Sequence, residues 1–271
     1  MKSCFNTITA GRERPLEEII NACGAAGFSG IEIDLHHLDA ATRHISLSGI
    51  KRQIEDASLQ PVSVMAFDLA PLAEDTVALD RFKRGVDSAL DLGAPRLLVY
   101  CATNIPAGMQ PAEARARAAQ RASLYAELAG QITIGLEPIA RTTLMGTPAE
   151  AFQIAEAAAA LNVGVVMDTF HFYRAGVIDL RSYPVDKFSW VHVNDAEDLP
   201  IEQLKDANRL HPGHGILPLE SYLQALVDGK YDGFLSVEIF RPAYWRQPVS
   251  QVVREAKESV ERLTAKIGVS L

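Results

Sequence analysis

The sequence predicts an α/β fold, a single-domain (β/α)8 TIM barrel that covers residues 1–271. Short apolar runs alternate with longer helical patterns, and this alternation occurs eight times. Such near-continuous apolar runs are typical of parallel strands that are buried on both faces. No Gly-rich phosphate turn follows the first strand, which argues against a doubly wound open sheet, and no linker divides the chain.

The first half of the chain contains four strand–helix units. Pro15 suits the first turn of a helix, and Gly27 suits its C-terminal stop. Gly93 closes the third helix in the same way, and the fourth helix is rich in Ala, the residue with the highest helix propensity. We expect strands at residues 3–8, 31–35, 61–67 and 96–100, and helices at residues 15–26, 47–57, 75–92 and 111–129.

The second half repeats this pattern. Thr147 is a suitable N-cap for the fifth helix, whereas the sixth helical segment is the weakest of the eight. A long connection follows the seventh strand and ends near Pro218. We expect strands at residues 132–136, 163–167, 188–193 and 234–237, and helices at residues 148–160, 178–183, 219–227 and 249–266.

The composition argues against several classes of partner. The 34 acidic residues against 26 Lys and Arg give a net charge of -8, which argues against nucleic acid. No apolar run reaches the roughly 20 residues of a membrane helix, and the first strand begins without a signal peptide. We therefore expect a cytoplasmic protein with no membrane partner. The three cysteines are odd in number and widely spaced, which favours reduced core thiols over disulfides.

The last four strands each end in a side chain that can bind a metal. Glu137, Asp168, His192 and Glu238 should face one another across the barrel mouth, because active sites of this fold lie at the C-terminal strand ends. Singly they could be a loop acid, a helix cap, a core histidine and a partner of Arg241. Together, three carboxylates would repel one another, and a divalent cation relieves that repulsion.

These ligand types favour one divalent metal ion as cofactor. Oxygen ligands with a single nitrogen suit Mn²⁺ best, with Mg²⁺, Co²⁺ or Zn²⁺ as alternatives. Vicinal oxygens of a small polyol or ketose substrate could complete the coordination shell, and the ion would acidify the proton beside the carbonyl. Glu137 and Glu238 are the candidate catalytic groups for moving that proton through an enediolate.

Two residues beyond the strand ends are candidate substrate contacts. His171 could donate a hydrogen bond to a substrate oxygen, or it could lie behind the site or on the surface. Arg209 belongs to a Pro/Gly-rich loop that can reach the mouth, together with His211 and His214. The glycines of this loop could instead serve only its turns.

Glu32 is the third candidate substrate contact. It alternates with Ile31 and Ile33, so either Glu32 or Asp34 could point into the mouth, and one of the two could instead pair with a neighbouring strand. A group of histidines follows, for which solvated positions are favoured over positions at the substrate rim: His36, His37 and His44.

Motifs at the strand ends resemble the xylose-isomerase-like sugar isomerase/epimerase superfamily over essentially the whole chain. Within it the sequence is most similar to the 2-keto-myo-inositol isomerases (inosose isomerases) of inositol catabolism, through Asp195-Ala-Glu-Asp-Leu-Pro and the Phe-Arg-Pro that follows Glu238. The motifs shared with the superfamily are Gly135-Leu-Glu-Pro, Met167-Asp-Thr-Phe-His, Val191-His-Val-Asn-Asp, Pro212-Gly-His-Gly and Ser236-Val-Glu-Ile-Phe.

This resemblance implies a metal-dependent enzyme that moves a carbonyl between adjacent ring carbons of an inosose through an enediol. It implies metal ligands at the four strand ends and substrate contacts from His171 and Arg209. A homodimer is a further expectation at the level of the family. The sequence departs from the family pattern at His214 and over residues 34–45, so the substrate rim does not follow from the resemblance.

Other functions are compatible with the same scaffold, because a fold does not fix a reaction. A ketose 3-epimerase, a hydroxypyruvate isomerase or an inosose dehydratase could use the same site. An endonuclease-IV-like repair enzyme needs further histidines after strands three and four, where this chain has Phe67-Asp68 and Tyr100-Cys101. A non-catalytic sugar-binding barrel would be favoured by loss of a ligand, and all four ligands are present.

Overall fold

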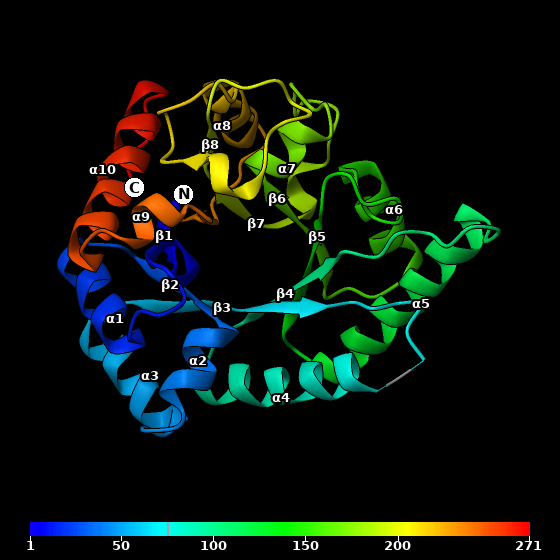
Figure 1. Ribbon diagram of the computed structural model, residues 1–271, viewed down its shortest axis with the longest axis horizontal. Helices are drawn as coiled ribbons and strands as arrows, with labels where there is room; N and C mark the ends of the chain where they lie inside the picture. Colours follow the sequence, from blue (N-terminus) through cyan, green and yellow to red (C-terminus); the bar gives the residue numbers. More distant parts are fainter. Residues whose placement is uncertain (75) are drawn as a thin grey trace.

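The computed structural model describes residues 1–74 and 76–271, and its strands form a closed parallel barrel (Figure 1). Around the barrel the strand order is β1-β10-β7-β6-β5-β4-β3-β2, so β10 closes against β1. The predicted single TIM-barrel domain is confirmed. The barrel strands are β1 (Lys2–Asn6), β2 (Gly30–Asp34), β3 (Gln60–Asp68), β4 (Arg96–Cys101), β5 (Thr133–Pro138), β6 (Val163–Asp168), β7 (Phe188–Val193) and β10 (Phe234–Val237).

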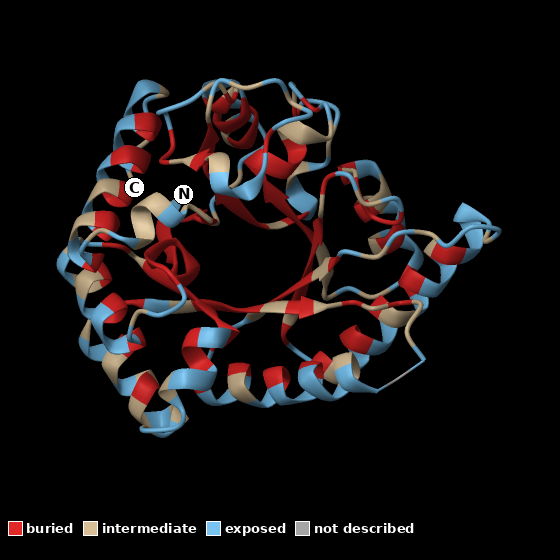
Figure 2. Cartoon of the chain, in the orientation of Figure 1, coloured by how far each residue is buried: buried red, intermediate tan, exposed pale blue. Residues whose placement is uncertain are grey.

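Helices surround the barrel and turn their buried sides toward the strands (Figure 2). The outer helices are α1 (Leu16–Ala25), α3 (Leu47–Asp56), α4 (Val77–Leu92), α5 (Pro111–Ala129), α6 (Pro148–Ala157), α8 (Leu219–Asp228) and α10 (Val249–Lys266). Shorter elements lie in the connections: η1 (Thr7–Ala10), α2 (Leu35–Ala41), α7 (Thr169–Arg174), η2 (Val185–Lys187), β8 (Asp195–Ala196), η3 (Asp206–Asn208), β9 (Arg209–Leu210) and α9 (Pro242–Trp245).

The predicted elements differ from the observed ones at a few boundaries. Asp75, with which the third helix was expected to begin, lies outside the described residues. The first strand ends at Asn6 because the Asn6 side chain accepts a hydrogen bond from the backbone N–H of Ile8 and caps η1. The predicted helix at residues 178–183 is wrong, since that segment is irregular and the helix after β6 is α7. Asp168 caps α7 immediately at the strand end, so no loop separates strand from helix.

A small apolar cluster inside the barrel lies apart from the main core between strands and helices. It consists of Met65, Leu98, Val166 and Trp190. The Trp190 ring occupies space that a side chain on β5 would need, because a Cβ on Gly135 would lie 2.5 Å from it. The lumen is therefore packed, and polar side chains gather at the C-terminal strand ends above this cluster.

Two predictions that rest on composition concern the cysteines and the absence of a membrane-spanning helix. Cys4, Cys23 and Cys101 are buried free thiols, as expected for reduced core residues. Among the residues that the structure describes, no helix has both the length and the apolar character needed to cross a bilayer.

Gly135→Ala should lower the free energy of unfolding. The added methyl group would clash with Trp190 and with Val166 Cγ2, which lies 2.6 Å from the Cβ position. Overpacking of this kind typically costs about 1–3 kcal/mol. Urea unfolding followed by tryptophan fluorescence measures the change. An unchanged unfolding midpoint would show that the barrel lumen accommodates the added methyl group, which would contradict the close packing of Trp190 against Gly135.

Candidate metal centre

Four strand ends bring the predicted metal-binding side chains together. Glu137 and Asp168 close β5 and β6, His192 lies near the end of β7, and Glu238 follows β10 directly. One potential ligand atom from each residue lies within 4.8 Å of the others, and all four residues are buried. These ligand atoms are therefore close enough to bind one ion.

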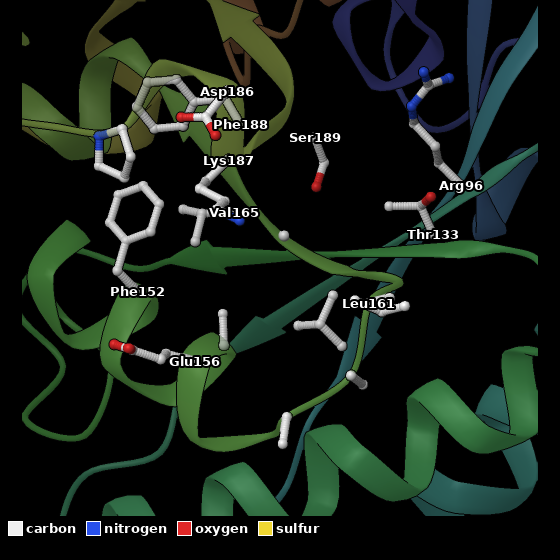
Figure 3. A pocket seen from close by; sticks show the side chains of 16 residues that line it. Arg96, Thr133, Phe152, Glu156, Leu161, Val165, Asp186, Lys187, Phe188 and Ser189 are labelled. Atoms are coloured by element: carbon white, nitrogen blue, oxygen red, sulfur yellow. The ribbon is translucent and has the colours of Figure 1, made fainter.

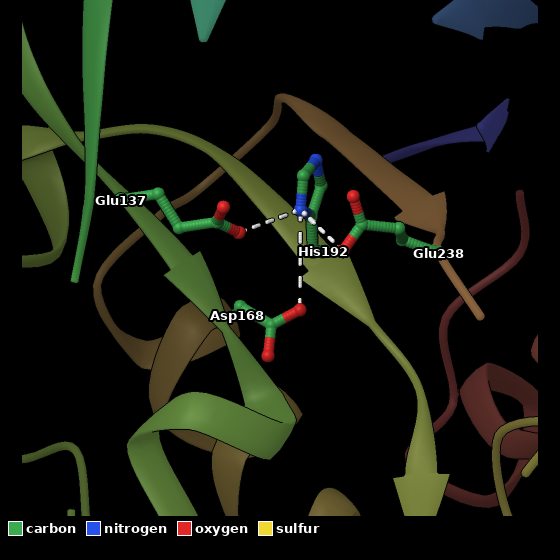
Figure 4. Close-up of side chains that lie close together, drawn as sticks. All are labelled: Glu137, Asp168, His192 and Glu238. Atoms are coloured by element: carbon green, nitrogen blue, oxygen red, sulfur yellow. Dashed lines mark hydrogen bonds and ion pairs between the residues drawn. The ribbon is translucent and has the colours of Figure 1, made fainter. Parts of the chain in front are cut away.

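His192 is at the centre of this group. Its Nδ1 lies 3.0 Å from Glu137 Oε1, 3.3 Å from Glu238 Oε2 and 3.9 Å from Asp168 Oδ2. Figure 4 shows the three carboxylates pointing toward this one nitrogen from three different directions. Three carboxylate oxygens and an imidazole nitrogen in one small volume form a donor set that suits a divalent cation.

Each of these residues could have a role outside a metal site, and the structure shows only some of those roles. Asp168 is both a helix cap and a member of the group, since its Oδ1 accepts from the backbone N–H of His171 and its Oδ2 faces the centre. Arg241 pairs with Glu197 rather than with Glu238. The partners of His192 are carboxylates and an indole rather than a backbone carbonyl.

The electrostatics of the group reflect its crowding. Burial first, and then the nearby Glu238, raise the pKa of Glu137 to about 7. Burial disfavours charge on His192, but the Glu238 and Glu32 carboxylates outweigh it and raise the pKa of this imidazole well above its ordinary value. Burial also opposes ionisation of Asp168, yet Arg209 lowers the pKa of this carboxyl to about 2.

Arg209 contributes a buried positive charge directly beside the group. Its Nη1 lies 2.8 Å from Asp168 Oδ2 and 3.0 Å from Glu238 Oε2. The guanidinium also lies over the rings of Phe170 and Phe240, at 4.8 and 5.4 Å from their centres. This arrangement neutralises part of the acidic charge and fixes Arg209 at the mouth.

His171 lies next to Arg209 and is neutral. Arg209 Nη2 is 3.1 Å from His171 Nε2, and because a guanidinium can only donate, Nε2 must accept. Burial, partly offset by Asp168, lowers the pKa of His171 to about 4. The ring proton is therefore on Nδ1, which is buried and has no hydrogen-bond partner.

Glu32 and Asp34 both belong to β2, but only Glu32 contacts the group around His192. Glu32 has no exposed surface, and its Oε2 lies 2.9 Å from His192 Nε2, on the side of the ring opposite the three carboxylates. Asp34 caps α2 by accepting from the backbone N–H of His36.

The histidines that follow β2 and β9 are divided between core and surface. The expected solvated position is wrong for His37, whose ring is buried and bonded to Thr7 Oγ1 and the carbonyl of Gly11, because α2 turns it inward. His211 is also buried and stacks on Tyr244 at 4.3 Å. The remaining members are at least partly open to solvent: His36, His44 and His214.

The comparison with known families agrees with this geometry. Residues 20–266 match the family described as "Xylose isomerase-like TIM barrel". The chain belongs to this family. The protein is a sugar isomerase/epimerase-like enzyme, as the sequence motifs predicted.

Relatives of the whole chain are found within this family. The inosose isomerases of Halalkalibacterium halodurans and Bacillus velezensis are each 26% identical over 275 residues, covering 98% of this chain and 97% and 98% of their own. The crystal structure described as the IOLI protein with a binding zinc atom has a TM-score of 0.89 and 24% identity, covering 98% of this chain and 99% of its own.

Two asparagines that are not among the predicted site residues also form hydrogen bonds with the acids of the site. Asn194 Nδ2 donates to Asp168 Oδ2 at 2.9 Å, and its backbone and side chain both bond to Thr169 Oγ1. Asn6 Nδ2 donates to Glu238 Oε1 at 3.2 Å. Both asparagines lie at strand ends, so the positional signal that identified the acids would also have identified them.

A separate open groove of about 820 Å³ lies at the other end of the barrel (Figure 3). It is lined by the N-terminal parts of β4 to β7 and by the end of α6, and Arg96, Leu161, Lys187 and Ser189 are among its residues. None of the four metal-binding candidates lines it. Active sites of TIM barrels lie at the opposite end, where the four candidates are.

Affinity for divalent metal should rise with pH. Binding requires ionised Glu137 and an unprotonated His192 Nδ1, and the pKa values of both groups lie above their ordinary values. We expect apparent affinity to fall as pH drops through about 7, the value for Glu137. Calorimetry in buffers of different ionisation enthalpy should show proton release. Equal affinity at about pH 6 and about pH 8, without proton release, would contradict this linkage.

Arg209→Met should destabilise the metal-free protein strongly. The change leaves the buried carboxylates of Asp168 and Glu238 without their cation, and such a loss typically costs about 3–5 kcal/mol. Saturating Mn²⁺ or Zn²⁺ should reduce the loss by binding the same carboxylates. Urea unfolding with chelator and with metal measures both values.

Arg241→Met is the matched control, since it removes a more exposed pair with Glu197 that is worth about 0–1 kcal/mol. Equal losses for the two variants, or no effect of metal on the Arg209 variant, would contradict the assignment of Arg209 as the counter-charge of the group.

Proposed function

We propose that the protein is a divalent-metal-dependent isomerase that moves a carbonyl between adjacent carbons of a keto-inositol, with 2-keto-myo-inositol as substrate. The observation that carries the proposal is the convergence of three carboxylates on His192 at the C-terminal end of the barrel. The full-length similarity to two inosose isomerases supports the choice of substrate.

The metal ligands in this proposal are Glu137, Asp168, His192 and Glu238. When bound, a divalent ion would polarise the substrate carbonyl and acidify the carbon-bound proton beside it. Mn²⁺ was the ion favoured by the ligand types, and the zinc in the IOLI protein structure makes Zn²⁺ the second ion to test.

Glu137 and Glu238 are the proposed catalytic acid and base. One carboxylate removes the proton from the hydroxyl-bearing carbon, which leaves an enediolate, and the proton returns to the former carbonyl carbon. The hydroxyl proton of the first carbon moves to the former carbonyl oxygen, so the carbonyl has shifted by one carbon. Metal binding would keep Glu137 ionised, and the ionised carboxylate is the form that accepts the substrate proton.

His171 and Arg209 are the proposed substrate contacts. The unpartnered Nδ1–H of His171 can donate to a substrate oxygen. Arg209 is held beside it by Asp206, whose Oδ1 lies 3.2 Å from Nη2. The five N–H groups of Arg209 already face protein acceptors on Asp168, Glu238, His171 and Asp206, so Arg209 would contact the substrate by exchanging one of these partners for a substrate oxygen. Together with His171 it would orient a vicinal diol against the carboxylates.

Glu238→Gln should abolish turnover without loss of the fold. The amide keeps the shape of the side chain but cannot accept a proton as the carboxylate does, so kcat should fall by at least about 10²-fold. Steady-state kinetics with circular dichroism as a check on folding measures the effect. Activity equal to wild type would remove Glu238 from the mechanism.

Deuterium uptake in D₂O tests the reaction itself. The panel is 2-keto-myo-inositol, a free ketohexose and hydroxypyruvate, each with chelated protein and with Mn²⁺ or Zn²⁺ restored. We expect metal-dependent exchange beside the carbonyl and a new ketone isomer from the inosose alone. Exchange confined to the ketohexose would replace this proposal with a 3-epimerase, and exchange confined to hydroxypyruvate would replace it with a hydroxypyruvate isomerase. Silence with all three, without product, would overturn the substrate class.

A further inference from the structure

Glu32 lies behind the His192 ring, with its Oε2 2.9 Å from Nε2. It lies in the middle of β2, where its register partners are Asn6 on β1 and Ser63 on β3. Its carboxylate has no exposed surface, which does not fit the substrate contact expected from the sequence. A substrate at the mouth would have to pass the group around His192 to reach it.

Both oxygens of the Glu32 carboxylate accept hydrogen bonds from protein donors. Oε1 accepts from the hydroxyl of Ser63, and Oε2 accepts from the hydroxyl of Ser236. Oε2 also lies 2.9 Å from His192 Nε2 and 3.5 Å from Asn6 Nδ2. Oε2 therefore has three donors and Oε1 has one, and all four belong to the protein. The donors lie on β1, β3, β7 and β10, so protein contacts from four strands fix the orientation of Glu32.

Two groups compete for the same nitrogen of His192. Glu32 can only accept from Nε2, whereas the indole N–H of Trp190, 3.2 Å from Nε2, can only donate to it. If Trp190 donates, the neutral ring carries its proton on Nδ1, where it faces Glu137 and Glu238 and cannot bind a metal. If Glu32 accepts, the neutral ring carries its proton on Nε2, and the lone pair of Nδ1 faces the carboxylates.

We propose that Glu32 is a positioning residue that holds His192 in the form protonated on Nε2 and so keeps Nδ1 available to a divalent ion. Ligating histidines in proteins almost always donate their second ring N–H to a carboxylate, a carbonyl or water, and loss of that partner typically weakens metal affinity about 10- to 100-fold. Ser63, Ser236 and Asn6 contribute indirectly, because their hydrogen bonds orient the Glu32 carboxylate. The inference rests on the proposed function only through the bound ion, not through the substrate.

The first test compares Glu32→Gln with Asp34→Asn. Both replace a buried acid of β2 by its amide, but Asp34 caps α2 and has no contact with His192. Competition with a fluorescent chelator measures Zn²⁺ and Mn²⁺ affinity without any substrate. We expect about 10- to 100-fold weaker binding for Glu32→Gln and a change within about twofold for Asp34→Asn. Equal affinity of Glu32→Gln and wild type would overturn the role of Glu32.

Adding Trp190→Phe to Glu32→Gln tests the competition directly. The second change removes the donor that favours the wrong tautomer, so part of the lost affinity should return. A purely structural role of Glu32 predicts a further loss instead, because Trp190 fills the barrel lumen. That further loss would overturn tautomer selection.

A measurement on the wild-type protein keeps the inference testable if the variants do not fold. In the zinc-loaded protein labelled with nitrogen-15 at histidine, two-bond correlations should show a proton on His192 Nε2 and none on Nδ1. The opposite assignment would overturn the proposal. Wild-type protein that binds no divalent ion would overturn the proposed function, whereas tight binding that does not depend on Glu32 would overturn only this inference.

Discussion

The structure depends on the burial of several like charges at one end of a parallel barrel. Glu137, Asp168 and Glu238 converge on a single imidazole nitrogen, and Glu32 lies behind the ring. Burial of ionised groups is unfavourable unless each is paired or hydrogen-bonded. The surroundings meet that requirement with donors from neighbouring strands and loops: Arg209, Asn194, Asn6, Ser63 and Ser236. The polar residues around the centre therefore offset the cost of burying the acids.

The barrel architecture makes this concentration of charge possible. Each acid lies on or beside a strand that is hydrogen-bonded on both sides, so the side chains cannot easily move apart to relieve their repulsion. Below them the lumen is closed by Trp190 and its apolar neighbours, which limits access of water from that end. A cation is the simplest neutralising group for such a site, and Arg209 supplies only part of the charge.

His171 and Glu32 both lie near the candidate metal centre, but they differ in the hydrogen bonds that they make to the rest of the protein. His171 has a buried ring N–H without a hydrogen-bond partner, and this is the group that we propose as a donor to a substrate oxygen. Glu32 is held by hydrogen bonds from Ser63, Ser236 and His192, and these contacts support the proposal that it orients His192. Both residues are predicted substrate contacts, and they differ in the hydrogen bonds that the protein already makes to them.

The sequence alone determined the barrel, most element boundaries and the four strand-end side chains of the candidate metal site, because apolar runs and the residues that end them are local patterns. It could not determine the helix after β6, because only the fold shows that Asp168 caps α7 with one carboxylate oxygen while the other faces His192. It could not distinguish Glu32 from a mouth residue, or a buried His37 from a solvated one, because both depend on which groups lie opposite. Those partners come from strands and loops distant in the chain, and only the closed barrel brings them within hydrogen-bond reach.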